Sequence, residues 1–157
     1  MLTQTSETAF RALVFLMVCK TDDPVPPARI AEHIDASPSY TAKVTAALVR
    51  AGILRAHRGM KGGVTLDRSP EEVTLLDVVE ACQGKILGDF CQDFDRLDLV
   101  CAYHRAMVEL HEAIISTLKR WTLADLAKDP LPAPEIRDAV PCRMHFSCAT
   151  HNEDSLE

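Results

Sequence analysis

No run of apolar residues in this chain of 157 residues is long enough to cross a lipid bilayer, so no membrane partner is expected. The chain also lacks a glycine-rich phosphate loop, a paired-carboxylate motif and a nucleophile beside a base, which argues against an enzyme. The apolar stretch Ala12–Cys19 is followed by Asp22 and Asp23 rather than by a small-residue cleavage site. We interpret it as part of a buried amphipathic helix in a cytoplasmic protein.

Charge is distributed unevenly along the chain. Residues 1–68 hold 9 Lys and Arg against 6 Asp and Glu, a net charge of +3, whereas residues 69–157 hold 8 against 17, a net charge of −9. Between Ala36 and Arg68, Asp67 is the only acidic residue. Because a local basic surface matters more for phosphate contact than the global charge, this segment is a candidate nucleic-acid surface.

Hydrophobic periodicity predicts a mainly α-helical protein with one small two-stranded hairpin, or wing. The Ser37-Pro38 pair is a helix-start signal, with Ser as the N-cap and Pro in the first turn. In chain order, the predicted helices are Glu7–Lys20, Pro27–Ile34, Pro38–Arg50, Thr74–Cys82, Leu99–Arg120 and Thr122–Lys128, and the predicted strands are Ile53–His57 and Gly63–Asp67.

Helices Pro27–Ile34 and Pro38–Arg50, joined by a tight turn, have the form of a helix-turn-helix. The second helix places polar side chains at its N-terminal end and turns Val44 and Leu48 inward. Hydroxyl and ammonium groups in such positions donate to phosphates and base edges, and a basic, glycine-rich hairpin suits a minor-groove contact. The candidate DNA contacts are Ser37, Ser39, Tyr40 and Lys43 on the helix, with Arg58 and Lys61 on the hairpin.

Two further features bear on assembly and chemistry. Apolar positions in Leu99–Arg120 approximate a repeat of about 3.5 residues, typical of either an internal core or a dimer seam. Six cysteines in a chain without a secretory signal favour metal ligands, redox sensors or core residues over structural disulfides. Cys19 and Cys82 fall on apolar helix faces, where we expect core thiols.

The run IAEHIDASPSYTAKVTAALVRAGILRAHRGMKGGVTL, followed by TLLDVVEAC, resembles the IscR/NsrR family of bacterial winged-helix regulators. The opening LTQTSETAFRALVFL and the later TLADL extend the resemblance to residues 2–128, and PVPPARIAE and SPSY are most similar to its RsrR branch of redox sensors. The resemblance implies a homodimeric transcription regulator that acts as a repressor and binds a pseudo-palindromic DNA operator. It also implies an iron–sulfur cluster as the sensor and crossing of the long C-terminal helices between subunits.

Cys91 and Cys101 are the central candidate cluster ligands, since thiolates are the soft ligands that iron–sulfur clusters use. His104 follows Cys101 by one helical turn, so both side chains could face one ligand. The resemblance implies that Glu7 ligates the cluster of the other subunit. His33 lies one residue out of register with a ligand histidine of the RsrR branch, and Ile34 takes the matching place.

Two thiolates combined with two N or O donors favour a 2Fe-2S cluster over a cubane, which normally takes three or more thiolates. Reduction, oxidation, nitrosylation or loss of the cluster would then move the Cys91–Cys101 loop and the long helix. This movement would change the spacing of the two recognition helices in the dimer. The alternative is a cluster-free member of the family, regulated by thiol oxidation, zinc, a partner protein or a small ligand.

The tail carries Cys142, His145, Cys148 and His151 at successive spacings of three. This pattern could hold zinc or lend Cys142 or Cys148 to the iron site, or it could be a disordered tail after many prolines. The predicted organisation is a winged helix-turn-helix domain at residues 1–83, a cluster-binding loop at 84–98, a dimerisation helix with a short following helix at 99–128, and a Pro-rich tail at 129–157.

Overall fold

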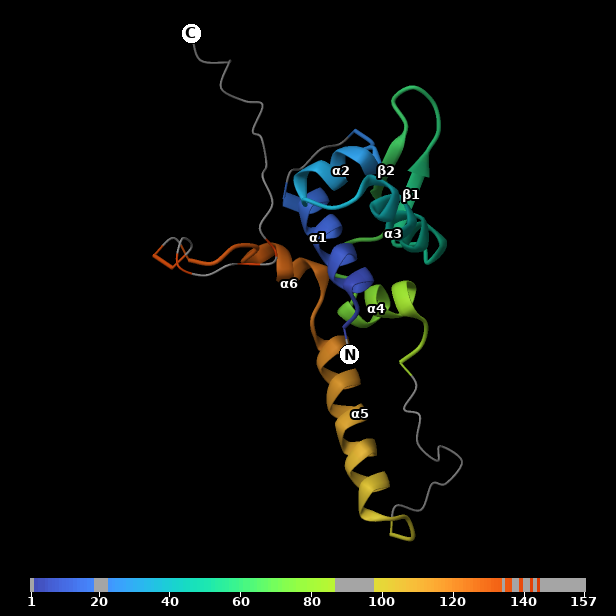
Figure 1. Ribbon diagram of the computed structural model, residues 1–157, viewed down its shortest axis with the longest axis vertical. Helices are drawn as coiled ribbons and strands as arrows, with labels where there is room; N and C mark the ends of the chain where they lie inside the picture. Colours follow the sequence, from blue (N-terminus) through green and yellow to red (C-terminus); the bar gives the residue numbers. More distant parts are fainter. Residues whose placement is uncertain are drawn as a thin grey trace.

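The computed structural model describes residues 2–18, 23–86, 98–133, 135–136, 139, 142 and 144. As predicted, the chain is mainly helical and carries a two-stranded antiparallel wing (Figure 1). The elements are α1 (Gln4–Val18), α2 (Pro27–His33), α3 (Pro38–Arg50), β1 (Leu54–His57), β2 (Gly63–Leu66), α4 (Leu75–Gln83), α5 (Ala102–Arg120) and α6 (Leu123–Lys128).

Helix α1 is the centre of the core. It packs against α2, α3, α4 and α6, and the apolar stretch that begins at Ala12 is buried as far as Leu16, with Met17 and Val18 half-buried. Large side chains of α1 and of the elements around it are fully enclosed, and burial of each contributes roughly 1.5–3 kcal/mol. The largest of them are Leu13, Ile30, Ile34, Leu48, Ile53, Leu54 and Leu123.

Helices α2 and α3 form the predicted helix-turn-helix. Each begins with a proline in its first turn, where the missing N–H removes no intrahelical hydrogen bond. Ser37 occupies the N-cap position of α3, but its side chain makes no capping hydrogen bond. Its Oγ lies 3.0 Å from the Oγ of Ser39 instead. Gly52, with a φ of 69°, turns the chain from α3 into the wing.

The wing pairs Leu54 with Leu66 and His57 with Gly63 in antiparallel register. The segment before α2 joins this sheet at one residue, since the N–H of Val25 donates to Val64 O at 3.0 Å and the N–H of Val64 donates to Val25 O at 2.9 Å. A Cβ at Gly63 would lie 2.4 Å from the carbonyl carbon of Val25. Only glycine permits this close approach, which anchors the wing to the body.

The starts of α4 and α6 lie side by side and have the same cap. Thr74 forms a capping box with Asp77, and Thr122 forms one with Asp125. Between the two caps, the N–H of Leu75 donates to Trp121 O and the N–H of Leu123 donates to Val73 O, both at 2.9 Å. The C-terminal end of α5 is therefore held in a fixed position against α4.

Helix α5 extends from the body away from the wing, and its amino-terminal end is the far end (Figure 1). It begins at Ala102, three residues after the predicted start, because Cys101 has an extended backbone conformation and forms the N-cap. None of its apolar side chains is fully buried, and Tyr103 and Leu110 are 70% and 52% exposed. Among the described residues, no helix is both long and apolar enough to span a membrane.

Candidate DNA interface and sensor residues

The outer face of α3 is polar at its start and carries cations further along. Ser39 and Lys43 are exposed, whereas Val44 and Leu48 are buried on the opposite face, as predicted. Ser37 is exposed immediately before the helix. Arg50 lies on the outer face as well, seven residues from Lys43, and it was absent from the contacts predicted from the sequence. The spacing of seven residues, two helical turns, is the signal that could have found it.

Tyr40 occupies a different environment from Ser39 and Lys43. Its side chain is half-buried and packs against the core. Its hydroxyl lies 2.8 Å from the Oγ1 of Thr5 at the start of α1. The ring of Tyr40 therefore packs α3 against the core, and its hydroxyl joins α3 to α1.

The tip of the wing presents cations to solvent. Arg58 and Lys61 are exposed on either side of Met60, and none of the ion pairs found in the described part of the chain includes Lys43, Arg58 or Lys61. Arg55 differs from them, since one of its guanidinium nitrogens lies 2.6 Å from the carboxylate of Asp67. Arg68, at the end of the basic segment, also forms an ion pair, with Asp77 at 3.8 Å. The basic surface predicted from the sequence thus divides into cations available to phosphates and two arginines engaged in ion pairs.

The candidate cluster ligands lie on separate elements. Cys101 is exposed at the N-cap of α5, and its side chain makes no capping hydrogen bond. His104, one turn further, is 4% exposed, and Glu7 is half-buried in the first turn of α1. Cys91 lies outside the described residues. Within those residues, no three His, Cys, Asp or Glu side chains come together in a metal-binding arrangement.

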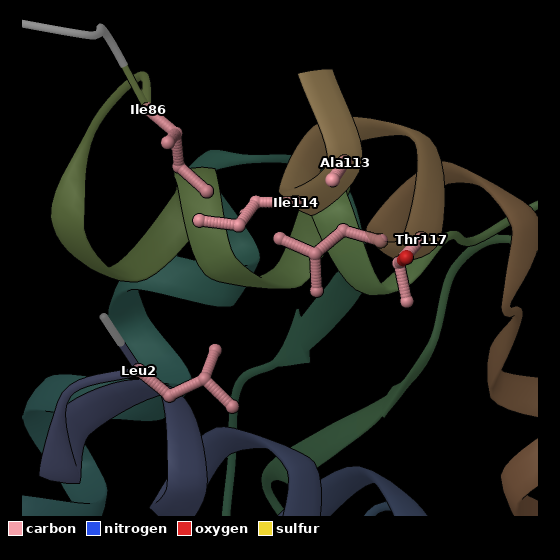
Figure 2. A pocket seen from close by; sticks show the side chains of 6 residues that line it. Leu2, Ile86, Ala113, Ile114 and Thr117 are labelled. Atoms are coloured by element: carbon pink, nitrogen blue, oxygen red, sulfur yellow. The ribbon is translucent and has the colours of Figure 1, made fainter. Parts of the chain in front are cut away.

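The segment just before α1 lies beside α5 near the C-terminal end of that helix. Leu2, Ile86, Ile114 and Leu118 line an apolar pocket of about 460 Å³, and Figure 2 shows the side chains of Leu2, Ile86 and Ile114 converging there. Cys101 precedes Ile114 by 13 residues, which is about 20 Å along a helix at roughly 1.5 Å per residue. Leu2, five residues before Glu7, therefore lies near one end of α5, and Cys101 lies at the other.

The remaining cysteines and His33 complete the predicted set. Cys82 is half-buried against the core, as predicted, and burial raises the pKa of its thiol to about 11. Cys142 is half-buried, and Cys19, His145, Cys148 and His151 lie outside the described residues. The Nδ1 of His33 lies 2.8 Å from Arg29 O, and its ring contacts that of Phe15 at a tilt of 35°, with centroids 4.7 Å apart. These contacts account for His33 as a structural residue.

The helix-turn-helix and its basic wing define a winged-helix DNA-binding protein. A family model described as Rrf2, iron-dependent transcriptional regulator, matches residues 2–129. The chain belongs to the Rrf2 family. It is accordingly a transcription regulator and not an enzyme, and regulators of this family bind DNA and are typically dimeric.

Solved structures with the same fold include regulators whose names indicate different roles. CymR (YrzC), the global cysteine regulator of B. subtilis, is 22% identical, with a TM-score of 0.68 over 82% of this chain and 96% of that one. IscR of T. potens is 25% identical, with a TM-score of 0.67 over 82% of this chain and 87% of that one. The oxidised form of S. aureus CymR is 21% identical, with a TM-score of 0.65 over 82% and 96%.

Proposed function

We propose that this protein is a homodimeric repressor that binds a pseudo-palindromic operator. Its DNA binding is switched by the redox or ligation state of an iron–sulfur cluster of the 2Fe-2S type. The observation that carries the DNA-binding part is the presence of exposed cations on both α3 and the tip of the adjoining wing. Ser39 and Lys43 contact base edges and phosphates from α3, with Ser37 and Tyr40 beside them. Arg58 and Lys61 contact the neighbouring minor groove.

The exposed apolar face of α5 supports the homodimer. Tyr103 and Leu110 are largely exposed in the single chain, and a second copy of the same helix would cover them. A two-fold interface of this kind spaces two copies of α3 for the two halves of an operator. In this organisation residues 1–83 bind DNA, 84–98 hold the cluster, 99–128 dimerise and 129–157 form a tail.

The chemistry of Cys101 fits an iron–sulfur cluster. Its thiol is exposed and makes no capping hydrogen bond, and the N-terminal end of a helix favours a negatively charged ligand. When bound, the cluster supplies one-electron redox chemistry. We propose Cys91, Cys101 and His104 of one subunit as ligands, with Glu7 of the other. The separation of about 20 Å along α5 between Cys101 and Ile114, which lies beside Leu2 just before the helix of Glu7, supports this sharing between subunits.

Within this scheme, the chain's own residues connect sensing to DNA binding. Glu7 lies on α1, which packs directly against α3. Cys101 and His104 lie at the far end of α5, whose other end is fixed to α4 by the paired caps. A shift of either ligand-bearing segment is therefore transmitted to the recognition helix through packed elements and changes the spacing between the two copies of α3.

Subunit mixing tests the sharing of ligands. Homodimers of Cys101→Ser and of Glu7→Gln should each lose iron and sulfide. A heterodimer of these two variants, isolated with different affinity tags, retains one site with both residues intact if the ligands come from different subunits. We expect about half of the wild-type iron content. No iron in the heterodimer would place both ligands in the same subunit.

The DNA face is tested separately by Lys43→Ala and Arg58→Ala in binding assays on genomic fragments. Lys43→Ala is expected to weaken binding to the preferred fragments most, and Arg58→Ala to weaken binding to all fragments about equally. Ala28→Ser on α2 serves as a neutral surface control. Unchanged affinity in both variants would mean that the DNA face lies elsewhere.

One alternative has its own supporting observation. Cys101 is an exposed thiol, and the chain shares its fold with CymR, of which an oxidised form has been solved. A cluster-free protein would then respond by oxidation of Cys101. Iron and sulfide assays of anaerobically purified protein separate the two functions: a protein free of iron that loses DNA binding on peroxide treatment, reversibly by thiol reductant, supports the alternative.

A further inference from the structure

A groove runs between the recognition helix and the wing. Its helix side is formed by Ala42, Ala46 and Arg50, which follow one another at helical spacing along α3. Its other side is formed by β1 and by the turn, including His57 and Gly62, and the enclosed volume is about 560 Å³. The groove is separate from the apolar pocket at the end of α5, which lies on other elements.

Most of the side chains that line the groove are small, and none of them is acidic. Arg50 is the one charged residue of the lining apart from the titratable His57. Arg50 is exposed and has no ion-pair partner in the part of the chain that the structure describes. The groove is therefore expected to take a negatively charged occupant.

The geometry of B-DNA supplies such an occupant. A protein that places a helix in the major groove and a hairpin in the adjacent minor groove spans the sugar–phosphate strand that separates the two grooves. In this protein, the space between α3 and the wing is the groove beside Arg50. A DNA strand in this position brings its phosphates past the side chains that line the groove.

We propose that the groove seats the sugar–phosphate backbone of one DNA strand in each subunit and that Arg50 contacts a phosphate of that strand. The proposal rests on the proposed DNA face and adds to it a contact and a steric requirement. Ala42 and Ala46 leave space for the strand. A Cβ at Gly62 would lie 2.7 Å from His57 O and 2.8 Å from Gly59 O, so the turn cannot accept a side chain there without moving.

Arg50→Gln tests the phosphate contact, and Arg55→Gln is its matched control. Both remove one exposed arginine from the same region, but Arg55 already pairs with Asp67 and does not line the groove. The measurement is the affinity for a 30-base-pair duplex of mixed sequence between about 50 and 200 mM salt. For each phosphate that the protein no longer neutralises, the slope of log K against log salt falls in magnitude by about 0.9.

We expect Arg50→Gln to reduce the slope by about 0.9 per subunit engaged and Arg55→Gln to leave it unchanged. Thermal unfolding midpoints close to that of the wild type would establish that both variants are folded. A wild-type slope in Arg50→Gln would overturn the proposal. If Lys43→Ala and Arg58→Ala still weaken binding in that case, the DNA face stands and only the groove is misassigned.

Ala46→Leu tests the steric requirement, with Ala46→Ser as the variant of nearly native size. Leucine is a good helix former, so the substitution fills the groove without weakening α3. We expect Ala46→Leu to lower the affinity for the duplex at least about tenfold and Ala46→Ser to bind like the wild type. Equal affinity of Ala46→Leu and the wild type would show that no DNA strand enters the groove.

Discussion

The hydroxyl of Tyr40 lies 2.8 Å from the Oγ1 of Thr5, and this hydrogen bond joins the recognition helix to the first turn of α1. Glu7, the proposed cluster ligand, is two residues from Thr5, and Ser39, a proposed DNA contact, is next to Tyr40. This pair of hydroxyl groups is therefore one direct connection between the segment of the proposed ligand Glu7 and the DNA face, in addition to the packing of α1 against α3.

Tyr40→Phe should reduce the coupling between the cluster and DNA binding. The substitution removes the hydroxyl and keeps the ring that packs against the core, at a cost of about 0.5–1.5 kcal/mol in the free energy of unfolding. We expect the ratio of DNA affinities between the cluster-bound and cluster-free forms to move toward one. The measurement is that ratio, rather than either affinity alone.

Thr5→Val breaks the same hydrogen bond from α1 and leaves α3 untouched, so it should reproduce the change in the ratio. Thr5→Ser retains a hydroxyl and should behave as the wild type. If the ratio is the same in Tyr40→Phe, Thr5→Val and the wild type, coupling runs through other contacts.

Gly63→Ala is predicted to destabilise the protein by about 1–3 kcal/mol, the usual range for an atom forced into a packed site. The added Cβ meets the backbone of Val25 at 2.4 Å, and backbone cannot rotate away as a side chain can. Chemical denaturation provides the free energy of unfolding. Gly59→Ala is the comparison, since a Cβ there meets nothing within 4 Å and any cost comes from its φ of 110° alone.

Cys101 and Cys82 should differ sharply in alkylation. Burial raises the pKa of the Cys82 thiol to about 11, so the reactive thiolate is scarce at pH 8, whereas Cys101 is exposed. With iodoacetamide and cluster-free native protein, mass spectrometry should find Cys101 modified well before Cys82. Labelling of Cys82 at the rate of Cys101 would contradict the packing of α4 against the core.

Asp125 should titrate well below an ordinary aspartate. Hydrogen bonds from the Lys128 side chain, then from the backbone and side chain of Thr122, lower its pKa to about 2. Because the folded pKa lies below the unfolded value of about 3.9, the stabilisation is fully present above pH 4 and is lost as the pH falls through 2. Carboxyl carbon shifts in NMR measure this pKa, and Lys128→Gln should raise it.

Much of the fold could be predicted because its determinants are local. Prolines in first turns, threonine caps before α4 and α6 and the glycines of the hairpin each act within a few residues of their own position. Apolar periodicity then indicates the buried faces of α1 and α3. The sequence predicts the start of α5 three residues early because the extended conformation of Cys101 leaves no periodic signal.

The features that sequence does not reveal depend on residues far apart in the chain. The place of Tyr40 at the N-terminal end of α3 predicts a DNA contact, but the Tyr40 hydroxyl is paired with Thr5, 35 residues away. A spacing of seven residues from Lys43 places Arg50 on the same face of α3, but its position beside the wing depends on how the hairpin folds back toward the helix. Under the proposed scheme the cluster ligands come from two subunits, so they would form no cluster of side chains within one chain.

The DNA affinity with and without the cluster tests most directly whether an iron–sulfur cluster controls DNA binding. Protein purified without oxygen is assayed for iron and sulfide, and its affinity for the genomic fragments that it selects is measured before and after removal of the cluster. We predict a coloured protein with equal amounts of iron and sulfide and an affinity that changes at least about tenfold, or about 1.4 kcal/mol. A colourless, iron-free protein that binds the same fragments equally well in both redox states would contradict the account.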